Sequence, residues 1–262
     1  MFPLRDDNPS ILTPFSTVSL IVLNCLAWIL LQGMGTEPAL STSVCRFALV
    51  PGDLLGTLPP GSSFPVGPDM VCQTSSSRGW YTLFSSMFMH GSWLHVIGNM
   101  WFLWIFGNNV EDAMGHIRFV IFYLLCGLSA AGLQLYLTNN PEIPMVGASG
   151  AIGGVMGAYV LLYPRVQVQM LVIFGFFVTT IAVPAVVMLG YWFLIQLLGG
   201  FTTITGQGGG VAFWAHVGGF AAGALLIFGF RNPRLLARHP YHGWHNRSPY
   251  RNWQRVPRRH KR

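Results

Sequence analysis

The side chains best suited to chemistry in this 262-residue chain lie in three short polar motifs. A serine hydroxyl beside an imidazole can attack a peptide carbonyl, because the imidazole takes the hydroxyl proton and later gives it to the leaving amine. Each motif stands at the start of an uncharged apolar stretch, where polar side chains are costly and indicate function. Together they predict a hydrolytic site within a membrane. The motifs are His90-x4-His95-x3-Asn99, Gly147-Ala148-Ser149-Gly150 and Ala215-His216-x2-Gly219.

Ser149 and His216 are the expected catalytic pair, with Ser149 as nucleophile and His216 as base. An acidic third member is not expected, because no Asp or Glu follows Glu142. Glu111 and Asp112 fall at the opposite end of the apolar stretch that begins with the first motif. A serine–histidine dyad is therefore the simplest arrangement that the residues allow.

The first motif predicts hydrogen-bond donors for a developing negative charge. His95 and Asn99 are one helical turn apart, so both can point at the same spot as oxyanion donors. His90 precedes them near the expected outer interface and could help to hold the water that hydrolysis consumes. Each of these residues could instead form only structural hydrogen bonds between helices.

Glycines surround both residues of the expected pair. A helix that begins at Ser149 offers unpaired N–H groups and the positive end of a dipole near the hydroxyl. Small residues at helical spacing let a second backbone approach closely, which would bring the serine and the histidine together. The same glycines could equally serve only to pack helices. The glycines in question are Gly147, Gly150, Gly153 and Gly157 around the serine, and Gly219 and Gly223 after the histidine.

The composition is that of a membrane protein. Hydrophobic residues make up 52% of the chain, charged residues 9%, and mean hydropathy is +0.49, whereas about 25% charge is usual in soluble domains. We expect an all-α, polytopic membrane protein, a bundle of six transmembrane helices. The expected apolar stretches are Phe15 to Leu31, Trp93 to Phe106, Ile117 to Leu137, Gly150 to Leu162, Val166 to Leu198 and Val211 to Phe230.

The fifth stretch is too long for one crossing, since 33 helical residues would extend roughly 50 Å. Its first part alternates and turns near Gly175, and the residue before Pro184 is biased toward extended geometry. The sequence therefore predicts a short hairpin followed by a span from Pro184 to Leu198. A single tilted helix is the alternative.

Basic residues set the expected orientation. Ten of the fifteen Lys and Arg residues follow Phe230, so the positive-inside tendency places a tail of residues 231–262 in the cytoplasm. Six crossings then place the N-terminus there as well. We expect this tail to contact anionic membrane lipid, not nucleic acid. The expected location is the plasma membrane.

Residues 1–230 are expected to form one membrane domain with an outer loop at 33–79. The first apolar stretch lacks a convincing cleavage site and is expected to be retained as a span. Cys45 and Cys72 both fall in the outer loop, where a disulfide is permitted but two free thiols remain the alternative.

The three ordered motifs resemble the rhomboid family of intramembrane serine proteases. The segment Gly107-Asn-Asn-Val-Glu111-Asp is similar to family sequence as well. The resemblance implies cleavage of transmembrane protein substrates in or near their membrane segments, without a cofactor or metal. It also implies that Ser149 is the nucleophile, that His216 is the base, and that His95 and Asn99 are oxyanion donors.

Two departures from family sequence are visible, together with two rival functions. Trp80 is not followed by arginine, and Gly153 replaces an aromatic residue that stacks on the histidine in some relatives, so His216 needs other orienting contacts. One rival is a proteolytically inactive, rhomboid-like protein that binds membrane clients. The other is a metal or haem site built from His90, His95 and His216, which lacks an acidic ligand.

Overall fold

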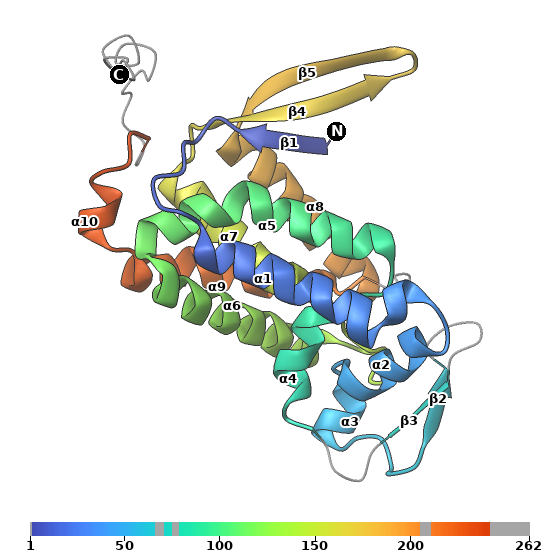
Figure 1. The fold of residues 1–262 in the computed structure, drawn as a ribbon. Helices are drawn as coiled ribbons and strands as arrows, with labels where there is room; N and C mark the ends of the chain where they lie inside the picture. Colours follow the sequence, from blue (N-terminus) through green and yellow to red (C-terminus); the bar gives the residue numbers. More distant parts are fainter. Residues whose placement is uncertain (1, 66–70, 75–78, 205–210, 242–262) are drawn as a thin grey trace.

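The computed structural model describes residues 2–65, 71–74, 79–204 and 211–241. Among these residues, six helices of 12 or more residues run roughly along one direction (Figure 1). The folded outer loop covers one end of the bundle, and the start of the C-terminal tail lies at the other end. The helices are α1 (Phe15–Leu26), which continues as a π-helical turn (Ala27–Leu31), α5 (Trp93–Met114), α6 (His116–Leu137), α7 (Ser149–Leu162), α8 (Ala185–Ile204) and α9 (Phe213–Phe230).

Three helices in the described part of the chain are long and apolar enough to cross a membrane: His116–Leu137, Ala185–Thr203 and Phe213–Phe230. Phe15–Leu31 and Ser149–Leu162 are shorter apolar helices. The predicted boundary of the second stretch at Phe106 is wrong, because α5 continues to Met114. Its polar last turns remain helical since Glu111 and Asp112 are buried and bonded to the N-terminal segment.

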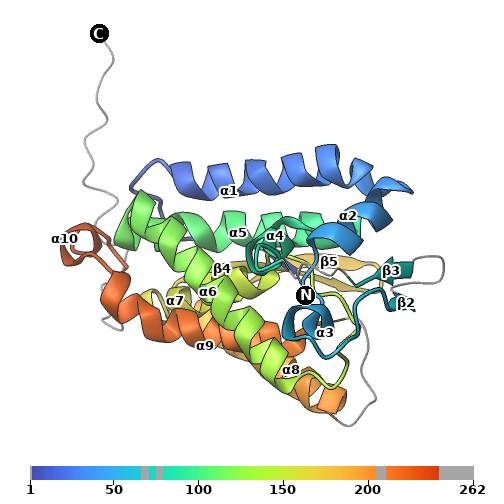
Figure 2. The same cartoon turned by 90° about the horizontal axis from the view of Figure 1, so that it is seen from below.

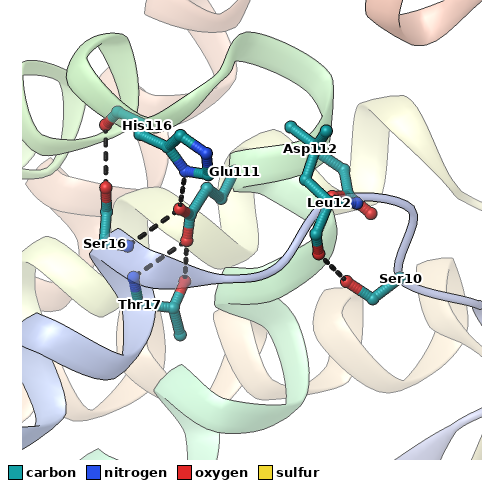
Figure 3. Close-up of polar contacts among 7 residues, drawn as sticks. All are labelled: Ser10, Leu12, Ser16, Thr17, Glu111, Asp112 and His116. Carbon is teal, nitrogen blue, oxygen red and sulfur yellow. Dashed lines mark hydrogen bonds and ion pairs between the residues drawn. The ribbon is translucent and has the colours of Figure 1, made fainter.

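The N-terminal segment is fastened to the end of α5 by two carboxylates (Figure 3). The Glu111 carboxylate accepts hydrogen bonds from the backbone N–H groups of Ser16 and Thr17, each at 2.8 Å. It also accepts the Thr17 hydroxyl at 2.7 Å and contacts Nδ1 of His116 at 2.5 Å. The Asp112 carboxylate accepts the N–H groups of residues 11 and 12. The Glu111 carboxylate thus satisfies donors that the start of α1 leaves unpaired, and the Asp112 carboxylate holds the segment before it.

Helix α7 lies at the centre of the bundle, between α5, α6 and α9 (Figure 2). Every residue from Gly150 to Tyr159 is buried. Its small residues permit a very close approach of α9. A Cβ atom at Gly219 would overlap the carbonyl oxygen of Gly150, and one at Gly223 would overlap that of Gly154.

This close approach predicts a large cost for Gly223→Ala. The added methyl would push α9 away from α7, and overpacking of this kind typically costs about 1–3 kcal/mol. Gly229 lies on the same helix with nothing within 4 Å of an added Cβ, so Gly229→Ala is the matched control. Thermal unfolding of both variants in detergent micelles measures the difference. Equal melting temperatures would show that the helix contact does not limit stability.

The expectation of an all-α fold is wrong in one respect, because two small antiparallel sheets are present. The first has the order β1-β4-β5 and contains β1 (Phe2–Asp6), β4 (Gln167–Phe174) and β5 (Phe177–Pro184). The predicted hairpin is confirmed: it turns at Gly175, whose φ of +59° suits glycine, and Pro184 leads directly into α8. The second sheet pairs β2 (Ser63–Pro65) with β3 (Val71–Gln73).

Strand β1 links the chain terminus to the bundle and to the hairpin. It pairs with β4, and the carbonyl of Pro3 accepts a hydrogen bond from the Trp101 indole at 2.7 Å. The Tyr159 hydroxyl of α7 donates to the Asp6 carboxylate. The residues before α1 therefore pack on α5 and α7, on the side of the bundle where the hairpin precedes α8 (Figure 1).

The outer loop folds into short helices and the second sheet. Its helices are α2 (Ala39–Phe47) and α3 (Pro51–Leu55), with a 3-10 turn at Gly33–Gly35. Helix α4 (Thr82–Ser85) and a 3-10 turn at Ser86–Phe88 follow the loop and lead toward α5. Cys45 and Cys72 form a disulfide between α2 and β3. Leu49 pairs with Met145, and the Gly147 N–H donates to the Ser86 carbonyl at 2.9 Å. The loop thus contacts the segment that precedes Ser149.

The start of the tail packs at the opposite end of the bundle. Helix α10 (Pro233–Leu236) follows α9, and the Asn232 N–H donates to the Ala113 carbonyl at 2.7 Å. Leu236 is buried, and the ring of His239 lies 4.5 Å from that of Tyr163. Most of the basic residues predicted to contact lipid, from residue 242 onward, lie outside the described residues.

Candidate active site

Ser149 and His216 are in hydrogen-bonding contact at the loop end of the bundle. Ser149 is the first residue of α7, and His216 lies in the first turn of α9. The distance between Ser149 Oγ and His216 Nε2 is 2.7 Å. The glycine contacts of α7 and α9 bring the two helix starts together. An imidazole at this distance can remove the hydroxyl proton as the oxygen attacks a carbonyl.

His95 and Asn99 face the segment just before the serine. Ser92 caps α5, its hydroxyl accepting the His95 N–H at 3.2 Å. A Cβ atom built on Gly147 would lie 2.7 Å from His95 Nε2 and 3.5 Å from Asn99 Nδ2. The Asn99 amide nitrogen is buried and has no hydrogen-bond partner among the described residues. Both side chains therefore present nitrogen atoms toward the turn that carries the serine.

These four side chains share one cavity. Its volume is about 480 Å³, and Ser149, His216, His95 and Asn99 all line it. Phe102 of α5 and Trp192 of α8 line it as well, so it extends between those two helices. None of the residues that line it is acidic. The arrangement offers a nucleophile, a base and hydrogen-bond donors in one cavity.

His90 lies beside this group but is held by other contacts. It is fully buried, and its ring centroid lies 5.0 Å from that of His95 in an edge-to-face arrangement. The Gln32 amide bonds both the N–H and the carbonyl of His90, at 2.8 and 2.6 Å. Burial lowers the pKa of the His90 imidazole to about 3, so the ring is neutral at physiological pH and supports His95 by packing.

The glycines around the serine have separate structural roles. Gly147 adopts a φ of +121°, which favours glycine and turns the chain into α7. A Cβ on Gly150 would lie 2.6 Å from the Cβ of Ala130. A Cβ on Gly153 would lie 3.0 Å from the carbonyl oxygen of His216. The close approach of α7 and α9 therefore makes position 153 tight for any side chain larger than glycine.

Sequence reasoning missed Gln196 of α8. Its Oε1 lies 2.7 Å from His216 Nδ1, and the ring of Trp192 lies 5.8 Å from the imidazole. A signal existed, because Gln196 is the one amide side chain between Ala185 and Ile204, a segment without charged residues. Among the described residues, no group of three His, Cys, Asp or Glu side chains is placed to hold a metal ion. Both ring nitrogens of His216 contact other side chains, those of Ser149 and Gln196.

The fold and the site define a class: helical proteins of the membrane that carry a serine–histidine pair at the starts of two packed helices. The Rhomboid domain model matches residues 77–233, which include both residues of the pair, and the chain belongs to the rhomboid family. As a member of that family, it is embedded in a membrane.

Individual relatives support this assignment. RHOMBOID-like protein 4 of Arabidopsis thaliana is 30% identical over 181 residues, which cover 69% of this chain and 40% of that protein. The rhomboid protease GluP of Bacillus subtilis is 29% identical over 147 residues, which cover 56% and 26%. The rhomboid protease AarA of Providencia stuartii is 26% identical over 175 residues, which cover 61% and 59%. The chain thus spans less than two thirds of each of these relatives.

Proposed function

We propose that this protein is an intramembrane serine endopeptidase that cleaves peptide bonds in or near transmembrane segments of other membrane proteins. The observation that supports it is the 2.7 Å contact between Ser149 Oγ and His216 Nε2 in the cavity between helices. Two of the relatives described above are named rhomboid proteases. The dyad needs no cofactor.

In this mechanism Ser149 attacks the scissile carbonyl while His216 accepts the hydroxyl proton. His216 then gives the proton to the leaving amine, and water repeats the sequence on the acyl-enzyme. The tetrahedral oxyanion lies near Gly147, where the Asn99 amide and the His95 ring donate to it. The Ser149 backbone N–H, unpaired at the start of α7, is the third donor.

Substrate reaches the dyad from the side, between α5 and α8. Phe102 of α5 and Trp192 of α8 both line the cavity, which supports this route. Six spans, formed by α1, α5, α6, α7, α8 and α9, cross the plasma membrane in this proposal. Both termini then lie in the cytoplasm, and the basic tail contacts anionic lipid.

The test is cleavage by the purified protein in liposomes. A panel of single-span substrates carrying distinct N- and C-terminal tags is reconstituted with it, and fragments are sequenced by mass spectrometry. The proposal expects one or a few cuts at positions within or next to the substrate span. Binding of these substrates without any fragment would favour the inactive, client-binding alternative.

Asn99→Ala should slow turnover by about 10- to 1,000-fold, because loss of one oxyanion donor costs about that much. The Asn99 amide nitrogen has no hydrogen-bond partner among the described residues, so the melting temperature should stay near that of the wild type. Initial cleavage rates at saturating substrate measure the effect. Unchanged turnover would remove Asn99 from the oxyanion site. Asn24→Ala, which removes another buried amide far from the cavity, controls for general effects.

A further inference from the structure

The second ring nitrogen of His216 has a specific partner that a dyad does not require. Nε2 contacts Ser149 Oγ, while Nδ1 contacts Oε1 of Gln196, also at 2.7 Å. The three side chains come from α7, α9 and α8 and form one continuous chain of hydrogen bonds. Gln196 is buried, with 7% of its surface exposed. It is therefore held inside the protein at the back of the imidazole.

The orientation of the Gln196 amide follows from its other contact. Its Nε2 lies 3.4 Å from the backbone carbonyl of Trp192, one turn earlier on α8. A carbonyl oxygen can only accept a hydrogen bond, so the nitrogen end of the amide must face it. The oxygen end then faces His216. Because that oxygen can only accept, Nδ1 of His216 must carry the proton.

A proton on Nδ1 leaves Nε2 of the neutral ring with a free electron pair directed at Ser149. This tautomer is the one that can accept the serine proton. In the opposite tautomer Nε2 would already be protonated and could not act as base. Carboxylates perform this orienting task in serine protease triads. Here an uncharged amide does so, without a charge buried between apolar helices.

The imidazole has few other contacts that could fix its orientation. Gly153 carries no ring to stack on it, and Trp192 lies tilted at 38° and 5.8 Å away. Trp192 precedes Gln196 by one turn on the same face of α8, so one helix supplies both contacts. A shift of α8 relative to α9 would break the Gln196 bond and the ring contact together.

We propose that Gln196 is the positioning residue for the base: its side-chain oxygen holds His216 in the tautomer and orientation that accept the Ser149 proton. The proposal rests on the proposed protease function. It makes α8 part of the catalytic apparatus, because this helix both borders the cavity and completes a Ser149–His216–Gln196 hydrogen-bond chain.

Four variants test the proposal. Gln196→Leu removes the acceptor at similar volume, and Gln196→Asn retracts it by one methylene. Gln196→Glu keeps an acceptor at the same reach and should rescue function. Leu194→Met, at an exposed position on the same helix, is the control. We expect kcat to fall about 10- to 100-fold in the Leu and Asn variants, as for a displaced catalytic group, while KM changes less than about threefold.

The direct readout is the tautomer of His216. Nitrogen NMR of the full chain with labelled histidine, assigned by the loss of one signal in His216→Asn, distinguishes a proton on Nδ1 from one on Nε2. The wild type should hold the proton on Nδ1, and Gln196→Leu should give a mixture. If the Leu variant does not fold, the Asn and Glu variants give the same comparison.

The outcomes separate this proposal from the protease function. A wild type that cleaves no substrate would reject the protease function, yet its NMR spectrum would still show whether Gln196 fixes the tautomer. Wild-type kcat together with an unchanged tautomer in Gln196→Leu or Gln196→Asn would overturn the positioning role. Loss of kcat in Gln196→Glu equal to that in Gln196→Leu would also overturn it.

Discussion

Cleavage of a single-span substrate should fall by about 10⁴-fold or more when Ser149 is replaced by alanine, because no other nucleophile occupies its place. His216→Ala should have a similar effect, since the hydroxyl then lacks a base. The two side chains act as one unit across a 2.7 Å contact. The double variant should therefore be no slower than either single variant.

The same liposome assay measures these rates, with tagged substrate and mass spectrometry of the fragments. Ser129→Ala is a suitable control, because its hydroxyl bonds only the Leu125 carbonyl of its own helix among the described contacts. Residual cleavage at the same site by Ser149→Ala would assign the nucleophile elsewhere. Independent, additive losses in the double variant would mean that Ser149 and His216 do not share a step.

The motif spacing was sufficient to predict which helix ends meet. Ser149 and His216 each precede glycines at helical spacing, and these glycines allow α7 and α9 to touch. The hairpin at Gly175 was also predictable, because its alternation and its turn residue are local signals. Short-range sequence patterns were therefore enough to predict most of the helices and the four residues that line the cavity.

The features that were missed depend on contacts between distant segments. Gln196 reaches His216 only because α8 is rotated about its own axis so that this side chain faces α9. The spacing of residues along the sequence does not determine that rotation. Strand β1 has five residues and no pattern of its own, and its partner β4 lies more than 160 residues away. The expected location of the loop outside the cytoplasm permitted a disulfide. Only the folded loop shows that Cys45 and Cys72 lie close enough to form one.

Glu111 is a charged residue that lies inside a helix and is buried. The second apolar stretch was expected to end at Phe106, yet α5 continues through Glu111, whose carboxylate is fully buried. It takes up the first donors of α1, a helix whose own preceding residue, Pro14, makes no side-chain cap. The carboxylate therefore acts as the N-terminal cap of α1, supplied from another helix (Figure 3).

Glu111→Ala should consequently destabilise the fold by about 3–5 kcal/mol, the usual cost of removing one partner from a buried charged network. The N–H groups of Ser16 and Thr17 would be left unpaired in a dry environment. Glu111→Gln keeps the shape and one acceptor and should lose about 1–3 kcal/mol. Unfolding in detergent micelles measures both, with Glu37→Ala as the control at an exposed carboxylate.

This loss should be confined to stability. Asn99 precedes Glu111 by 12 positions on α5, roughly 18 Å along the helix axis, so folded Glu111→Ala molecules should keep the wild-type kcat at low temperature. Active-site titration gives the folded fraction for that comparison. A variant as stable as Glu37→Ala would mean that α1 does not depend on this cap. A reduced kcat per folded molecule would instead mean that the two ends of α5 are coupled.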